Sequence, residues 1–141
     1  MRHLPLLKAQ LRRHEGIRYK PYKDTVGKLT IGVGRNLDDK GISEQEAEYL
    51  LGNDIEDACV EATTIPGFSS LTPIRQCVLV ELCFNMGVYR VKKFKKMIAA
   101  LVLGDWNEAS MELLDSKWAE QVGYNRSTTL ANQLRTGKWQ K

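Results

Sequence analysis

Three polar residues near the start of the chain are of types that suit the hydrolysis of a glycosidic bond. Glu15 and Asp24 are carboxylates nine residues apart, and Thr30 follows six residues later. The reaction needs a carboxyl group that donates a proton, a carboxylate that activates water, and a group that holds the water. A threonine hydroxyl donates one hydrogen bond and accepts others, which suits the third task. Each residue alone is an ordinary helix-end, turn or strand residue, so the combination carries the argument.

Three different local elements would position these residues. A short amphipathic helix is expected at residues 4–14, and Gly16 ends it directly after Glu15. Strand-forming residues lie on both sides of a turn at residues 24–27, and Thr30 lies on the returning strand. A helix end, a turn and a strand therefore direct three polar groups towards one place.

The rest of the chain has helical periodicity. Residues 43–62 predict one long helix that begins with a capping box, in which Ser43 caps the helix and Glu46 reaches back to it. Further helices are expected at residues 72–86, 94–103, from 105 onwards, 116–122 and 125–134.

This order of elements predicts an α+β fold within a single domain, residues 1–141. A small antiparallel sheet lobe, about 15–42, is joined by a long linking helix, about 43–62, to a helical bundle lobe, about 68–141. The N-terminal helix 4–14 is expected to belong to the helical lobe. A cleft between the two lobes is the expected place for a site.

Composition and charge narrow the classes of function. The 43% hydrophobic and 27% charged residues are ordinary for a globular protein, and no stretch approaches the ~18 apolar residues of a membrane span. The N-terminus has no secretory signal, so we expect synthesis in the cytosol and no stable membrane insertion.

The net charge of +4 is unevenly distributed. Residues 88–97 hold five Lys/Arg and no acid, whereas residues 38–61 hold nine acids and Lys40. A basic face suits a polyanion such as an anionic cell-wall polymer or nucleic acid, and a merely solvated face is the alternative. The acidic segment and the absence of a DNA-reading helix motif argue against nucleic acid.

The three cysteines, Cys59, Cys77 and Cys83, lie in helical, apolar-periodic segments. We interpret them as reduced thiols in the core. Their spacing does not match a zinc site, so neither a metal nor another cofactor is expected.

Residues 15–34 read EGIRYKPYKDTVGKLTIGVG, and their Glu, Arg, Tyr, Asp, Thr and glycines resemble the catalytic region of the phage-type lysozymes, glycoside hydrolase family 24. The resemblance continues through FNMG at 84–87, GDW at 104–106, SKW at 116–118, NR at 125–126 and RTGKW at 135–139. It covers nearly the whole chain.

The resemblance implies a residue-by-residue assignment. Glu15 would be the proton donor, and Asp24 and Thr30 would activate and place the water. The substrate-binding candidates that it implies are Phe84, Asn36, Glu112, Arg126 and Tyr22. The substrate would be peptidoglycan, cut with inversion at the β-1,4 bond between N-acetylmuramic acid and N-acetylglucosamine.

The resemblance also implies a biological setting and contains one departure. We expect a monomeric endolysin that needs a holin-type pore or host lysis to reach the wall. Where the T-even branch of the family has a histidine after the second glycine, this chain has Arg35. Because Asp54 matches the partner of that histidine, we expect an Arg35–Asp54 pair.

Two other activities fit part of the pattern. A lysozyme fold that binds the wall without cutting it would not need Glu15, Asp24 and Thr30 together. A lytic transglycosylase cleaves the same bond with one acid and leaves an anhydro sugar, so a water site at Asp24 and Thr30 disfavours it.

Overall fold

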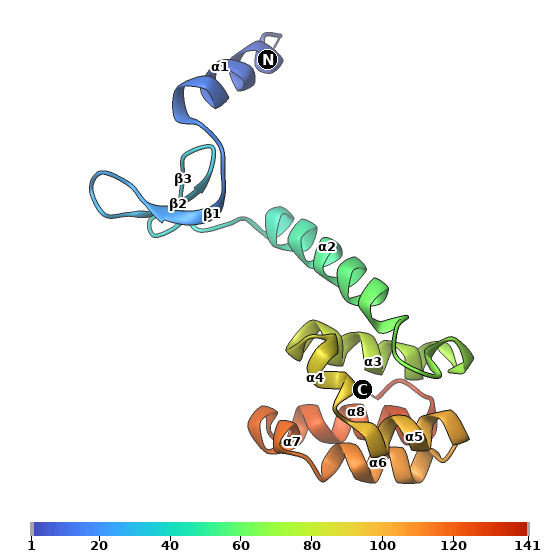
Figure 1. Ribbon diagram of the computed structural model, residues 1–141. Coiled ribbons are helices and arrows are strands. Elements are labelled where there is room, and N and C mark those ends of the chain that lie inside the picture. The colour runs from blue at the N-terminus through green and yellow to red at the C-terminus, as the bar shows by residue number, and fades with distance from the viewer. Residues whose placement is uncertain (1, 141) are drawn as a thin grey trace. The chain divides into compact units, whose positions relative to one another are not determined.

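The computed structural model describes residues 2–140 and divides into two compact units, Met1–Tyr49 and Leu50–Lys141. We call them the N-terminal unit and the C-terminal unit. The residues described contain eight α-helices and one three-stranded antiparallel sheet (Figure 1), so the predicted α+β fold is confirmed. The prediction of one domain with helix 4–14 in the helical lobe, and of a cleft, stays a prediction.

The N-terminal unit consists of one helix and the sheet. Helix α1 (Leu4–Glu15) is followed by β1 (Arg18–Lys23), β2 (Leu29–Gly32) and β3 (Arg35–Asn36), in the order β1-β2-β3. Helix α1 ends because Gly16 takes a positive φ of 73°, which only glycine adopts without strain, and its N–H donates to the carbonyl of Arg12. This break turns the chain into the sheet immediately after Glu15.

Helix α2 (Glu44–Ala62) begins with the capping box that the sequence predicts. The backbone N–H of Ser43 donates to Oε1 of Glu46 at 2.8 Å, and the backbone N–H of Glu46 donates to Oγ of Ser43 at 3.2 Å. Two backbone donors that the helix leaves without an intrahelical partner are thereby satisfied.

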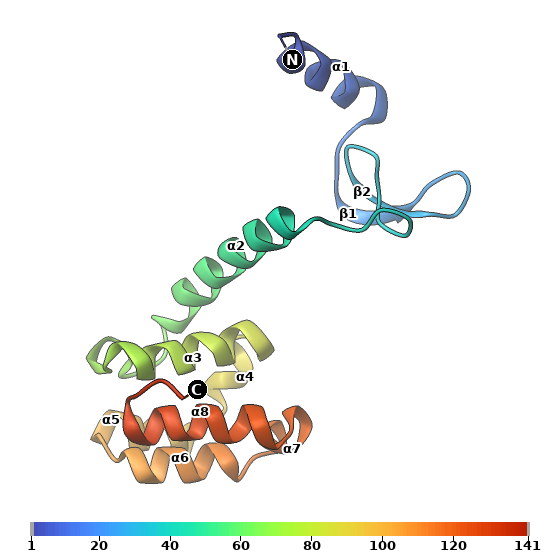
Figure 2. The same ribbon diagram turned by 180° about the vertical axis from the view of Figure 1, so that it is seen from behind.

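The C-terminal unit is built from helices. They are the 3₁₀ turn η1 (Phe68–Ser70), α3 (Pro73–Met86), α4 (Val88–Lys92), α5 (Lys95–Leu103), α6 (Trp106–Leu114), α7 (Lys117–Val122) and α8 (Tyr124–Thr136). Helix α8 packs against α3, α6 and α7, and Figure 2 shows α6 and α8 side by side. The sequence pattern predicts neither η1 nor α4, because elements of three and five residues are too short for a periodic pattern.

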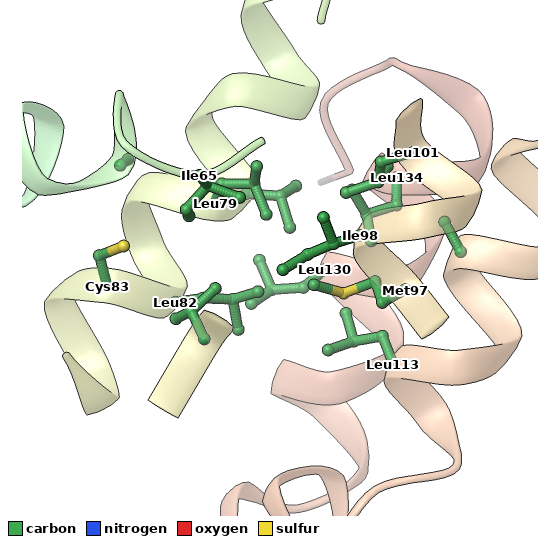
Figure 3. Close-up of a cluster of buried hydrophobic side chains, with 14 of the residues drawn as sticks. Ile65, Leu79, Leu82, Cys83, Met97, Ile98, Leu101, Leu113, Leu130 and Leu134 are labelled. Atoms are coloured by element: carbon green, nitrogen blue, oxygen red, sulfur yellow. The ribbon is translucent and has the colours of Figure 1, made fainter. Parts of the chain in front are cut away.

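The core of the C-terminal unit is a cluster of apolar side chains from α2, α3, α4, α5, α6, α7 and α8 (Figure 3). Leu79, Leu82, Leu113 and Leu134 are fully buried in it. Burial of apolar surface at about 25 cal/mol per Å² is the main favourable term in folding. The core therefore fixes the positions of the helices that carry the binding candidates of this unit.

One charged residue of α3, Arg75, is buried against the C-terminal end of α8. Its Nε donates to the carbonyl of Leu134 at 2.7 Å and its Nη2 to the carbonyl of Arg135 at 3.2 Å, while the guanidinium lies 3.9 Å from the ring of Trp106. These carbonyls belong to the last turn of α8, which has no intrahelical donors for them. Arg75 thus ties α3 to the C-terminal end of α8.

The three cysteines differ in burial. Cys83 is buried, and burial, together with the charge of Glu61, raises the pKa of its thiol to about 11. Cys59 and Cys77 are exposed. The interpretation as core thiols is therefore right for Cys83 and wrong for the other two.

Within residues 2–140, no helix combines the length and hydropathy needed to cross a bilayer.

Candidate active site

Glu15 is the last residue of α1, and its carboxylate lies against the turn between β2 and β3. A Cβ atom added at Gly34 would be 3.2 Å from Oε2 of Glu15. Gly34 also has a positive φ of 72°. Glycine at this position therefore does two things, because it makes the tight turn and leaves room for the carboxylate of Glu15.

Asp24 follows β1 and fixes the tip of the hairpin. Its Oδ1 accepts hydrogen bonds from the backbone N–H of Val26 at 3.0 Å and of Lys28 at 2.8 Å. This is an Asx-type turn, so Asp24 has the structural role that its sequence context also suggests. Within residues 2–140 its other oxygen, Oδ2, accepts no hydrogen bond, which leaves that oxygen available to bind or deprotonate a water.

Thr30 is buried, with 3% of its surface exposed, and its Oγ1 donates to the carbonyl of Lys28 at 2.9 Å. The hydroxyl proton is thus used within the strand, and the oxygen retains its capacity to accept. In the sheet Thr30 is paired with Tyr22 on β1 and with Asn36 on β3. Directly paired residues share a face of the sheet, so the register places one catalytic candidate between two binding candidates.

Both binding candidates of the sheet have local partners. Tyr22 lies under the guanidinium of Arg18, whose Cζ is 5.0 Å from the ring centroid. The amide of Asn36 donates to Asp39 at 3.0 Å and accepts from the backbone N–H of the same residue at 3.0 Å. A substrate would therefore compete with Asp39 for the amide of Asn36.

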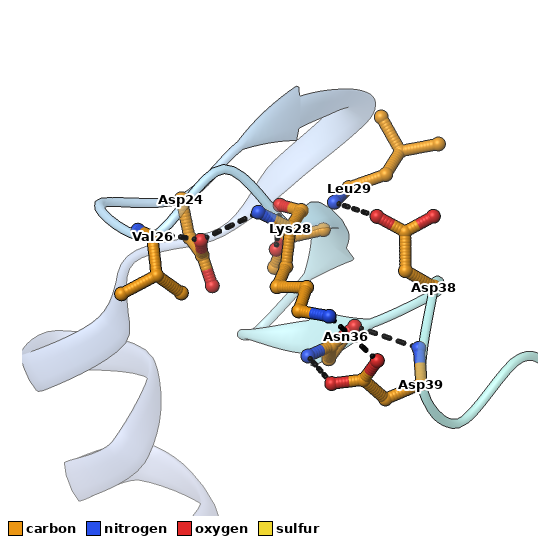
Figure 4. A network of polar contacts seen from close by, with 8 residues as sticks. Asp24, Val26, Lys28, Leu29, Asn36, Asp38 and Asp39 are labelled. Carbon is orange, nitrogen blue, oxygen red and sulfur yellow. Dashed lines mark hydrogen bonds and ion pairs between the residues drawn. The ribbon is translucent and has the colours of Figure 1, made fainter.

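Carboxylates hold the turns of the sheet in place (Figure 4). Asp38 accepts from the backbone N–H of Leu29 at 2.7 Å, and Asp39 pairs with Nζ of Lys28 at 3.1 Å. Lys28 also donates its backbone N–H to Asp24. Lys28 therefore connects the turn of Asp24 to the turn of Asp39 through one residue.

Arg35 forms a bidentate pair with Glu46 within the N-terminal unit. Its Nη1 donates to Oε1 of Glu46 at 2.8 Å and its Nη2 to Oε2 at 2.6 Å. The Arg35 guanidinium, followed by the backbone N–H of Ser43, lowers the pKa of Glu46 to about 2. One carboxylate thus serves both the helix cap and Arg35. The expected Arg35–Asp54 pair joins residues of the two units and stays a prediction.

Two binding candidates meet in the C-terminal unit. Phe84 and Arg126 line one hollow of about 380 Å³ together with Glu81, whose Oε2 pairs with Nε of Arg126 at 3.0 Å. The remaining lining residues are Leu51, Ile55, Cys59, Cys77 and Val80. The hollow is mostly apolar, with one ion pair and a half-exposed aromatic ring, as suits a ligand with both apolar and polar faces.

Glu112 lies elsewhere, in a second hollow of about 310 Å³ that it lines together with Lys96 and Asp115. A hydrogen bond with Glu112 raises the pKa of Glu108 one turn earlier on α6. The candidates thus fall into three groups, one in the N-terminal unit and two in the C-terminal unit. Sequence reasoning missed the pairing roles of Glu46 and Glu81, of which only Glu46 had a signal, its place in the capping box. Gly34 belongs to the motif that the sequence analysis singles out, but its contact with Glu15 was not predicted.

No group of three or more His, Cys, Asp or Glu residues among those described is arranged to hold a metal ion. What the N-terminal unit offers instead is acid–base chemistry. Glu15 presents a carboxyl group beside a glycine turn, and Asp24 presents a free carboxylate oxygen. Thr30 offers a hydroxyl oxygen between Tyr22 and Asn36.

Comparisons with known proteins show which proteins this chain is similar to. The chain is 32% identical to the pre-baseplate central spike protein Gp5 of Enterobacteria phage T4, over 79% of this chain but only 24% of that protein. It is 29% identical to probable T4-type lysozyme 1 of Dictyostelium discoideum, over 93% of this chain and 94% of the relative. It is 27% identical to the endolysin of Acyrthosiphon pisum secondary endosymbiont phage 1, over 93% and 89%.

A sequence model of the family described as phage lysozyme matches residues 12–140. All the catalytic and binding candidates named above lie within that range. The chain belongs to the phage lysozyme family.

Proposed function

We propose that this protein is a muramidase that hydrolyses the β-1,4 bond between N-acetylmuramic acid and N-acetylglucosamine in peptidoglycan. The observation that carries the proposal is the placement of the Glu15 carboxylate against Gly34, in the same unit that holds Asp24 and Thr30. Membership of the phage lysozyme family and relatives named as lysozymes support it.

In this proposal Glu15 donates its proton to the glycosidic oxygen as the bond to the anomeric carbon breaks. Water attacks the anomeric carbon from the opposite face, and its proton passes to Oδ2 of Asp24, the oxygen that the turn leaves unused. Thr30 accepts a hydrogen bond from the water through Oγ1. The product is inverted, which requires the two carboxyl groups to be about 6.5–9.5 Å apart when substrate is bound.

The biological setting that we propose is lysis of a bacterial host. A relative named as an endolysin supports it. In that setting the protein acts as a monomer and stays in the host cytoplasm until a holin-type pore releases it to the wall. Measuring the mass of the protein in solution tests the first statement, and comparing host lysis with and without a co-expressed holin tests the second.

The reaction is tested by digesting purified peptidoglycan with the wild type and with Glu15→Gln, then reducing the products and reading them by mass spectrometry. We expect reducible muramic acid ends from the wild type and almost none from the variant. Anhydro ends would assign a lytic transglycosylase. Binding to the wall without products from either protein would assign a non-catalytic wall-binding module.

A further inference from the structure

The C-terminal unit carries a cluster of positive charge that spans the end of α4 and the start of α5. We call it the basic ridge, and its members are Arg90, Lys92, Lys93, Lys95 and Lys96. Within residues 2–140, the three ion pairs present involve none of these five. All are exposed except Lys92, which is half-buried. The ridge therefore presents unpaired charge to the solvent, and the proposed cleavage does not use it.

On one side of the ridge, acids offset the lysines. Lys93, Lys95 and Lys96 line the hollow that Glu112 and Asp115 also line. Lys96 also opposes the rise in the pKa of Glu108, so its charge acts on the carboxylates of α6. An anion entering this hollow would meet the like charges of Glu112 and Asp115 beside the three lysines. The two acids therefore offset much of the attraction that the lysines on this side offer to an anion.

On the other side the lysines face no acid. Lys92 and Lys95 line a hollow of about 400 Å³ whose other lining residues are Thr64, Pro66, Ile98 and Ala99. Among the described residues that line it, none is acidic and none is aromatic. An anion here gains attraction from two ammonium groups without repulsion from the wall of the hollow, and short carbon chains can contact Pro66 and Ile98.

We propose that the basic ridge, with the hollow beside Lys92 and Lys95, binds a linear phosphodiester polymer of the bacterial cell wall. Lysine binds phosphate as a point charge. A run of cations suits a polymer with repeated charges better than a single anion, because each neutralised phosphate releases counterions. The inference rests on the proposed function for bringing the protein to the wall, and it adds an attachment surface outside the catalytic candidates.

Nucleic acid is also a linear phosphodiester polymer, but the hollow fits it less well. Proteins that bind single strands without sequence preference stack bases on aromatic rings. The described lining beside Lys92 and Lys95 offers no ring for stacking. A polyol-phosphate chain needs only the cations and a small apolar contact, which are both present.

The test measures binding of the full chain to purified poly(glycerol phosphate) by calorimetry at 50 and 200 mM salt. The variant is Lys92→Gln/Lys95→Gln, which removes both charges and keeps the first two methylene groups of each side chain and most helix propensity. The matched control is Lys117→Gln/Lys138→Gln, because both lysines are exposed, lie in the same unit and carry the same charge. Unfolding curves establish that both variants remain folded.

We expect the ridge variant to bind at least about tenfold more weakly at low salt and the control to bind within about threefold of the wild type. The wild type should lose affinity steeply at 200 mM salt. No binding by the wild type, equal binding by the ridge variant, or an equal loss in the control would overturn the proposal. Tighter binding of single-stranded DNA at equal phosphate concentration, lost in the ridge variant, would also overturn it and assign a nucleic-acid surface.

The same measurement on Glu15→Gln separates this inference from the proposed function. If the ridge binds polymer, Glu15→Gln should bind it as the wild type does. If the wild type cuts peptidoglycan but does not bind the polymer, only the proposal for the basic ridge is contradicted. A wild type that binds the polymer through the ridge but yields no cleavage products contradicts the muramidase assignment while the attachment surface stands.

Discussion

The two units of this protein are stabilised in different ways. Thr30 is the one buried side chain among residues 2–49, whereas the whole apolar cluster lies between Ala58 and Leu134 in the C-terminal unit. The N-terminal unit is held by turns and polar contacts, including the Asp24 turn and the Arg35–Glu46 pair. The C-terminal unit is held by packing.

The proposed chemistry and most of the stability therefore belong to different parts of the chain. All three catalytic candidates lie where hydrogen bonds set the geometry, and small shifts of a reacting group can lower a rate strongly. Substitutions in the core should therefore act on stability, and substitutions around the sheet should act on cleavage more than on stability.

The largest effect on stability is expected from Leu79→Ala. Leu79 is fully buried, so the change leaves a cavity and should lower the free energy of unfolding by about 2–5 kcal/mol. Chemical denaturation measures it. Leu103→Ala is the control, because Leu103 is 83% exposed and should stay within about 0.5 kcal/mol of the wild type. Equal losses in the two variants would contradict a packed core in this unit.

The cysteines give a second probe of the C-terminal unit. Because the pKa of Cys83 is raised to about 11 and its thiol is buried, it should react with an aromatic disulfide reagent at pH 8 at least about tenfold more slowly than the other two. The exposed thiols, Cys59 and Cys77, should react first. Rapid reaction of all three in the folded protein would show that the core opens easily.

Gly34 tests the polar unit, with Gly32 as its matched control. Both glycines have a positive φ, so an alanine at either should cost about 1–3 kcal/mol of local strain. Only the alanine at Gly34 meets the carboxylate of Glu15, since nothing lies within 4 Å of a Cβ at Gly32. We expect Gly34→Ala to cleave peptidoglycan several-fold more slowly than Gly32→Ala at equal stability. Equal cleavage rates in the two variants would contradict a catalytic role for the contact between Gly34 and Glu15.

The smallest effect is expected from Glu46→Gln. The pKa of Glu46 is lowered to about 2, from an ordinary value of 4.5, so its contribution to stability is complete above pH 4.5 and is lost as the pH falls through about 2. The variant should lack this part of the pH dependence of unfolding between pH 5 and 2. Glu48→Gln, on the same helix, should retain it. The pair is partly exposed and open to salt screening, so the difference should be small.

The sequence predicted the fold well where local chemistry and periodicity agreed. The capping box of Ser43 and Glu46, the glycine end of α1 and the strand that holds Thr30 all follow from residues close in sequence. It did not predict the Arg35–Glu46 pair, because that contact depends on how the chain between β3 and α2 brings the two side chains together. Glu112 lines one hollow, whereas Phe84 and Arg126 line another. Which side chains share a hollow depends on helix packing, which a periodic pattern does not encode.

The most direct test of the central claim is the rate of peptidoglycan cleavage by Glu15→Gln compared with Glu48→Gln, each with its unfolding curve. Both changes remove one exposed carboxylate from the N-terminal unit. We predict that Glu15→Gln loses nearly all cleavage while its unfolding curve stays close to that of the wild type, and that Glu48→Gln keeps both. Cleavage by Glu15→Gln at the rate of the Glu48→Gln control would contradict Glu15 as the acid and the account of the N-terminal unit as the catalytic one.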